Sequence, residues 1–126
     1  MNETDREWLL DMLEYAQTAI RILGTADAAT LAADQTSFLA VSYAVQVIGE
    51  AANKVSPAGQ AALPDVPWRD AIAMRHRLVH GYRSRSAEIM EQTIAVRLPE
   101  LTAVLERILN KSVDDERSGA LPSEDQ

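Results

Sequence analysis

Cysteine is absent from the chain, which excludes a disulfide framework, a thiolate metal site and a cysteine nucleophile. No unbroken apolar stretch approaches the roughly 20 residues of a membrane span. The segment from Met1 to Glu7 also lacks the basic flank and the apolar run that are typical of a signal peptide. These absences predict a cytoplasmic protein that does not enter a membrane.

The composition is that of a soluble globular protein, with 126 residues, of which 47% are hydrophobic and 25% charged. A chain of this length forms one domain. Its net charge of -7 argues against a general nucleic-acid coat, because nonspecific affinity depends on neutralising phosphates. Residues 69–85 nevertheless contain five arginines and one aspartate, a local charge of +4. This basic window suits a phosphate site, although a solvated, arginine-rich helix end would have the same composition.

Two helices are predicted in the first half of the chain. Thr4 and Glu7 form a capping box, so the first helix should begin near residue 5, and Gly24 ends it. Its apolar residues recur at steps of three and four: Leu9, Met12, Leu13, Ala16, Ile20 and Leu23. The second helix runs from Asp34 or Thr36 to Val55, and residues 25–33 form a connection that holds at most a loose turn.

A third helix is predicted after a proline-rich connector. The connector spans residues 57–67 and has room for a short turn at 58–63. Asp65 is a candidate N-cap for a helix over 66–79, with Pro67 in its first turn.

The fourth predicted helix covers residues 87–111, with Ser84 or Ser86 as its cap. Pro99 should bend this helix, because proline has no N–H to donate to the Ala95 carbonyl. Residues 112–126 are polar, acidic and aperiodic and are predicted to be a disordered tail. No segment alternates with the period of a strand. The predicted architecture is therefore an all-α antiparallel bundle of four to five helices over residues 1–111.

The stretch from Met74 to Tyr82, Met-Arg-His-Arg-Leu-Val-His-Gly-Tyr, contains both histidines of the protein. Arg75, His80 and Tyr82 combine a permanent cation, a group that titrates near neutral pH and a phenol, which together can bind a phosphodiester and move a proton. In a regular helix, Arg75 and His80 would lie about 140° apart. Either the helix relaxes near Gly81, or a second chain completes the site across a two-fold axis. The small-residue helix faces favour the second arrangement, a homodimer.

Several of these residues allow other interpretations. His76 and His80 have the i, i+4 spacing of a metal-binding pair, but no third ligand stands nearby except the distant Glu50, so we predict no metal site. Glu50 lies among apolar and small residues, either as a surface carboxylate or as a partly buried partner of an arginine. Tyr82 could also be a structural aromatic at a helix end.

The chain resembles the HepT family in three blocks: Ile48-Gly49-Glu50-Ala51-Ala52, Pro67-Trp68, and the stretch 74–82. HepT proteins are small HEPN-domain toxins that are paired with an MNT-type nucleotidyltransferase antitoxin. The resemblance extends from about residue 3 to residue 111. The Arg-x4-His spacing alone is weak evidence, but the added Tyr and the upstream Ile-Gly-Glu-Ala block make the resemblance specific.

This resemblance implies a homodimer of helical bundles that acts as a metal-independent ribonuclease without a cofactor. Arg75 and His80 would be the catalytic pair, and Tyr82 would be the tyrosine to which the antitoxin adds AMP units. Further residues near the motif could support the reaction: His76, Arg77, Glu50 and Arg83.

The chain departs from the family pattern at three positions. His76 stands where relatives usually have Asn, which places a second titratable group in the site. Ser86 replaces an Asp that commonly follows the tyrosine, and Met90 replaces a frequent Trp. Because of the last two departures, the family pattern does not predict which contacts the fourth helix makes near the site.

RNA carries its own nucleophile, the 2′-hydroxyl, so the protein need supply only positioning, proton transfer and charge stabilisation. His80 could accept the 2′-OH proton or protonate the 5′-oxygen, and Arg75 could donate to the non-bridging oxygens. A second interpretation is a non-catalytic HEPN-like subunit that binds a nucleotide or docks a nucleotidyltransferase. A docking surface alone would not need the complete set of Arg, His and Tyr.

Overall fold

Helices make up nearly all of the protein in a computed structural model that describes residues 1–76 and 83–124, with side chains in 1–76 and 86–111. None of the described residues forms a strand, so the predicted all-α helical bundle is confirmed. The elements in order are α1 (Glu3–Leu23), α2 (Ala28–Ala33), α3 (Gln35–Lys54), α4 (Pro57–Ala62), α5 (Trp68–Ala73), the 3₁₀ turn η1 (Met74–His76), α6 (Arg83–Gln92), the π-helical turn η2 (Thr93–Arg97) and α7 (Leu98–Glu124).

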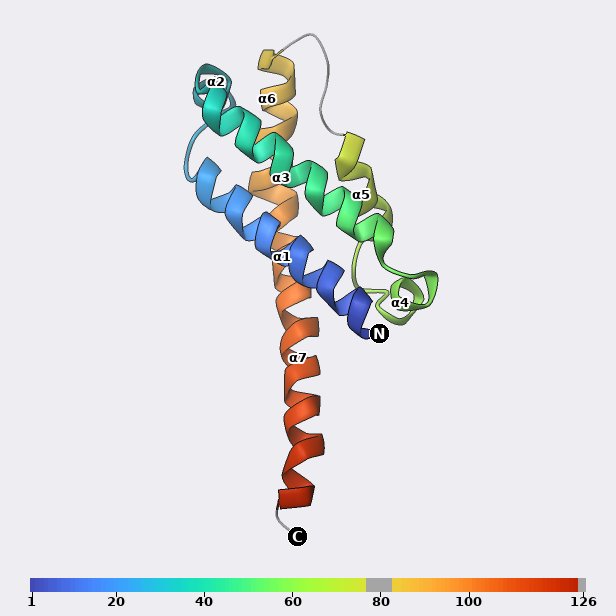
Figure 1. Cartoon of the computed structure of the whole chain (residues 1–126). Coiled ribbons are helices and arrows are strands. Elements are labelled where there is room, and N and C mark those ends of the chain that lie inside the picture. Colours follow the sequence, from blue (N-terminus) through green and yellow to red (C-terminus); the bar gives the residue numbers. More distant parts are fainter. Residues whose placement is uncertain (77–82, 125–126) are drawn as a thin grey trace.

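The long helices α1 and α3 pack antiparallel, and α5 with η1 lies along the other side of α3 (Figure 1). The continuous run of α6, η2 and α7 supports this pair from behind, through contacts of α7 and η2 with α1. The C-terminal part of α7 projects away from the other helices (Figure 1). The element that carries Arg75 therefore rests on α3, which is itself held in the centre of the bundle.

Short polar side chains set where the helices begin. The Asn2 side chain accepts a hydrogen bond from the Asp5 N–H at 2.7 Å, so α1 begins at Glu3 and the predicted Thr4 cap is wrong. Gly24 ends α1 at φ +57°, as predicted. Asp34 caps α3 through the Ser37 N–H, and α3 matches its predicted range.

Two connectors contain more helix than the sequence pattern predicts. Asp27 caps α2 within the segment predicted as a loose connection, and Ser56 caps α4, which begins at Pro57. Each is only six residues long, too short to show an apolar periodicity. The N-cap residue was therefore the available signal.

The last helical run begins earlier and ends later than predicted. Ser86 lies inside α6 and not at a cap. The π-helical turn η2 comes directly before Leu98 and Pro99, so the change to i→i+5 bonding accommodates the missing proline N–H. The sequence predicts an irregular tail from residue 112, whereas α7 continues as helix to Glu124. Adding residues to an existing helix costs far less than starting one.

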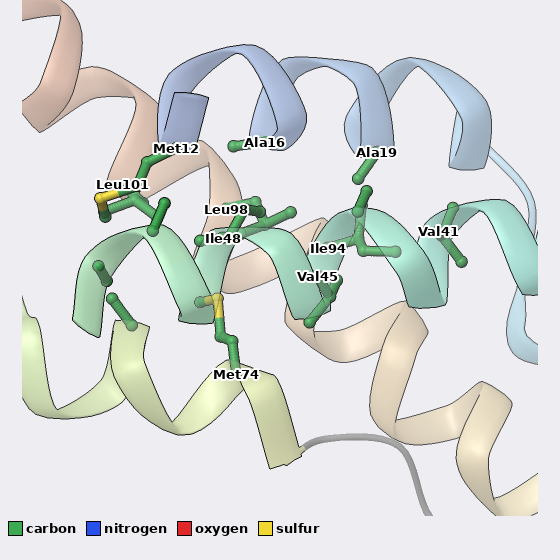
Figure 2. Packing of buried hydrophobic residues seen from close by; sticks show 14 of the residues in the cluster. Met12, Ala16, Ala19, Val41, Val45, Ile48, Met74, Ile94, Leu98 and Leu101 are labelled. Carbon is green, nitrogen blue, oxygen red and sulfur yellow. The ribbon is translucent and has the colours of Figure 1, made fainter. Parts of the chain in front are cut away.

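One hydrophobic core joins the helices. Figure 2 shows Met12, Ala16 and Ala19 of α1 facing Val41, Val45 and Ile48 of α3, with Ile94, Leu98 and Leu101 closing the layer from the η2–α7 side. Met74 points from η1 toward α3 and is 3% exposed (Figure 2). This methionine anchors the element that carries Arg75 to the core of the bundle.

A buried carboxylate ties the start of α1 to the junction of α3 and α4. Asp5 is 3% exposed and accepts hydrogen bonds from the Ser56 N–H at 2.8 Å and the Ser56 hydroxyl at 2.6 Å. The Ser56 hydroxyl oxygen accepts in turn from the Gly59 N–H at 3.0 Å. The two bonds from Ser56 hold the pKa of Asp5 below its ordinary value of 3.8, and the bond from the hydroxyl has the larger effect.

Asp5→Asn should lower the melting temperature by several degrees at pH 7, because an amide cannot accept both Ser56 bonds as a carboxylate does. The lowered pKa sets the sign of the pH dependence. The carboxylate's contribution is fully present above the unfolded pKa of about 3.9 and disappears as the pH falls through the lower folded-state pKa. Thermal melts from pH 7 down to pH 2 should show the two proteins converging in acid. Asp27→Asn is the control, since Asn caps equally well at that exposed position; an equal effect there would contradict the assignment.

Candidate functional site

The helix that leads into the predicted site is short and changes its geometry before the motif. α5 ends at Ala73, and η1 continues as a 3₁₀ turn from Met74 to His76, where a regular helix over 66–79 was predicted. The predicted N-cap is also wrong. No side chain caps α5, which follows Pro67, and the Asp65 carboxylate lies 3.7 Å from the Arg107 guanidinium. The Trp68 indole N–H instead donates to the Leu63 carbonyl at 3.0 Å, which fixes the start of α5 on the preceding loop.

Arg75 sits directly against α3 because residue 49 is glycine. A Cβ placed on Gly49 would lie 2.8 Å from the Arg75 Cβ and 2.9 Å from its Cα, and closer still to its backbone nitrogen. Real Cβ atoms do not approach other atoms this closely, so no other residue fits at position 49 without moving η1. The glycine at position 49 of α3 therefore receives the backbone of the arginine itself.

The Arg75 side chain is half-buried and oriented by its neighbour. Its Nε–H donates to the His76 Nε2 at 3.2 Å. The two Nη groups carry the remaining donors of the guanidinium. His76, predicted only as a supporting residue, is thus the described side chain that orients Arg75.

The other predicted site residues fall into two groups. Glu50 is an exposed carboxylate on α3 and forms no ion pair with the described residues, which favours the surface interpretation. His80, Tyr82 and Arg77 lie outside the described residues, as does the side chain of Arg83, so their roles stay predictions. Within the described part of the chain, no three His, Asp or Glu side chains gather with the spacing of a metal site.

The positions that depart from the family pattern on α6 are internal. Ser86 and Met90 are each 1% exposed, and Met90 belongs to the hydrophobic core. A methionine in place of a tryptophan at such a position changes core volume, and flexible methionine is suited to fill the remaining space. Both positions therefore belong to the packing of α6, which lies mainly against α2.

A surface that adjoins Arg75 was not predicted. An open depression of about 470 Å³ is lined by Pro67, Trp68, Arg69, Asp70 and Ala73. Arg69, Ala73 and His76 are all exposed and follow the i, i+4, i+7 spacing of one helix face. This spacing is the feature of the sequence from which the exposed face could have been predicted.

In the described chain, no helix has both the length and the hydropathy needed to cross a bilayer.

Comparison with known proteins connects this arrangement to ribonucleases. A family described as "Ribonuclease HepT-like" matches residues 12–108. "Probable ribonuclease HepT" of Thermococcus cleftensis is 28% identical over 75 residues, which are 60% of this chain and 68% of that protein. A "putative RNase" of Caldanaerobacter subterraneus subsp. tengcongensis is 26% identical over 109 residues, which are 86% of this chain and 97% of that protein. A "putative RNase" of Methanocaldococcus jannaschii is 25% identical over 104 residues, 82% of this chain and 86% of its own.

No solved structure matches the chain. The family match nevertheless extends from α1 into α7 and includes α3, α5 and η1, the elements that seat and orient Arg75. The chain therefore belongs to the HepT-like ribonuclease family.

Proposed function

We propose that this protein is a metal-independent endoribonuclease that cleaves RNA with Arg75 and His80. The observation that carries the proposal is the placement of Arg75 in a chain of this family. Its backbone is seated on Gly49, and its guanidinium is fixed through Nε by His76. The Nη groups are the donors left to bind a phosphate, and a planar guanidinium binds phosphate oxygens in pairs. The family membership supports RNA as the substrate.

The proposed reaction is an internal transesterification. The 2′-oxygen attacks the adjacent phosphorus, a 2′-O–P bond forms, and the P–O5′ bond breaks. The 2′-OH loses a proton and the departing 5′-oxygen gains one; His80 carries out one of these two transfers and water the other. Arg75 stabilises the negative charge that builds on the non-bridging oxygens. The products are a 2′,3′-cyclic phosphate and a 5′-hydroxyl. A homodimer would bring two copies of the motif to one cleft across a two-fold axis.

The test of this chemistry is cleavage of a defined RNA in excess EDTA, with analysis of the ends. We expect cleavage at an undiminished rate, ends that carry 2′,3′-cyclic phosphate and 5′-hydroxyl, and no cleavage of the same sequence with 2′-deoxyribose. Loss of activity in the chelator, or cleavage of the deoxy substrate, would refute the mechanism.

The same proposal includes control by covalent modification. The protein would be the toxin of a toxin–antitoxin pair, and an MNT-type nucleotidyltransferase would transfer AMP to Tyr82. The phenol oxygen attacks the α-phosphorus of ATP, an O–P bond forms, pyrophosphate leaves, and the phenol proton passes to a base. The added AMP brings negative charge and bulk into the basic window of residues 69–85 and would repel RNA.

Intact mass tests the modification. Protein purified together with its nucleotidyltransferase should be heavier by whole AMP units and inactive on RNA, whereas Tyr82→Phe should keep its unmodified mass and its activity. If the partner still silenced Tyr82→Phe covalently, Tyr82 would not be the modified residue.

A further inference from the structure

The depression beside α5 lies on the same helical element as Arg75 but is not part of the proposed catalytic pair. It is lined by Pro67, Trp68, Arg69, Asp70 and Ala73 and has a volume of about 470 Å³. This is within the size range of small-ligand sites. We propose that it is a subsite for a base of single-stranded RNA, two to three nucleotides away from the phosphate that Arg75 binds. The inference rests on the proposed ribonuclease function and adds to it how the substrate strand is held.

The lining favours a base over a phosphate inside the depression. Pro67, Trp68 and Ala73 contribute apolar surface, and aromatic side chains at such sites stack on bases of any sequence. The Asp70 side chain also lines the depression. Arg69 is exposed and forms no ion pair with the described residues, so it is available to the backbone of a strand whose base occupies the depression.

The depression lies on α5, and Arg75 follows it on η1. The Trp68 indole is held by the Leu63 carbonyl at 3.0 Å, and its ring packs against the core. The exposed face then continues through Ala73 to His76, which bonds Arg75. A strand that follows this face would run from Arg69 at the depression toward the Arg75 guanidinium.

The spacing sets which substrates can use the subsite. Arg75 is six positions after Arg69, and at helical rises of 1.5 to 2.0 Å per residue this distance along the helix is about 10 Å. A stacked strand advances about 3.4 Å per nucleotide. The subsite therefore lies beyond the reach of a dinucleotide and within reach of a longer oligonucleotide.

The experiment compares Arg69→Ala with the wild-type protein on a ten-nucleotide RNA and on a dinucleotide. Arg69→Ala should raise KM for the ten-mer about five- to tenfold with kcat unchanged, and it should leave the dinucleotide KM unchanged. The slope of log affinity against log salt for a 2′-deoxy ten-mer, which binds without being cleaved, should fall by about 0.7, because the variant neutralises one phosphate fewer. Arg21→Ala removes an exposed arginine at the far end of α1 and is the charge-matched control.

A binding signal separates this inference from the ribonuclease proposal. The chain has two tryptophans, and Trp8 lies under the Lys54 ammonium, 4.9 Å from its ring centre. In a Trp8→Phe background the fluorescence of Trp68 should be quenched by the 2′-deoxy ten-mer. Quenching without any RNA cleavage would refute the ribonuclease proposal and keep the subsite. Three results would overturn the subsite while the wild-type protein cleaves RNA. The first is that the ten-mer fails to quench Trp68, and the second is that Arg69→Ala and Arg21→Ala have the same KM. The third is that Arg69→Ala changes the oligomeric state of the protein and leaves KM unchanged.

Discussion

Arg75→Ala is expected to lower kcat for RNA cleavage by about 10²- to 10³-fold, the usual loss when a donor to the transition-state charge is removed. The structure gives the physical reason. The backbone of Arg75 is seated on α3 and its Nε–H donates to His76, which leaves the two Nη groups as donors for the substrate. The loss should appear mainly in kcat, because the charge on the non-bridging oxygens grows as the transition state forms. The measurement is single-turnover cleavage of a defined RNA in EDTA.

Two further variants sharpen this prediction. Arg75→Lys should recover little of the activity, because an ammonium cannot replace the planar pair of donors or the Nε–H that bonds His76. Arg97→Ala removes an exposed arginine from η2, outside the site, and should retain wild-type kcat. An Arg75→Ala protein that melts normally and keeps kcat within a factor of about three would remove Arg75 from the catalytic machinery.

The same variant distinguishes the two functional interpretations in cells. If the chain is a toxin ribonuclease, its expression should arrest growth, and Arg75→Ala should abolish the arrest. A non-catalytic docking subunit would lack the arrest in both forms.

The sequence predicted the long helices because their apolar spacing repeats over many turns. α3 follows its predicted range closely, since nine of its residues are buried and Asp34 supplies a clear cap. The short helices α2 and α4 were not predicted as such, because six residues cannot show a period and local caps decide them. The first cap was predicted at Thr4, whereas Asn2 caps α1, and Asp5 in its first turn bonds Ser56 from a distant part of the chain.

The sequence could indicate the chemical groups of the site but not their arrangement. Arg75 and His80 stand out because a cation and an imidazole lie in one short stretch. That Arg75 rests on Gly49 depends on packing between positions 26 residues apart, which no local pattern encodes. The bond between Arg75 and His76 likewise depends on side-chain rotamers after α5 has changed to a 3₁₀ turn. Spacing along an ideal helix therefore gave a reason to expect a composite site but no position for either group.

Gly49→Ala is expected to reduce cleavage about 10²-fold, close to the effect of a 1 Å displacement of a catalytic group. The added methyl group would lie 2.8 Å from the Arg75 Cβ and 2.9 Å from its Cα, so η1 must move away from α3. Two opposing effects act on stability. Overpacking costs about 1–3 kcal/mol, and replacing a mid-helix glycine by alanine recovers about 0.5–1 kcal/mol. The difference is a net loss of up to about 2.5 kcal/mol, so cleavage is measured well below the melting temperature of the variant.

A control variant and a double-mutant cycle distinguish an effect on the position of Arg75 from a general loss of stability. Leu105→Ala truncates a fully buried side chain of α7, which packs against α1, and should cost about 2–5 kcal/mol with kcat retained below its melting temperature. A double-mutant cycle is then decisive. If Gly49 acts by placing Arg75, Gly49→Ala combined with Arg75→Ala should be no slower than Arg75→Ala alone. If the fold losses of the two single variants multiply in the double variant, Gly49→Ala impairs something other than the position of the Arg75 guanidinium. The close approach of α3 to η1 would then be a matter of folding and not of catalysis.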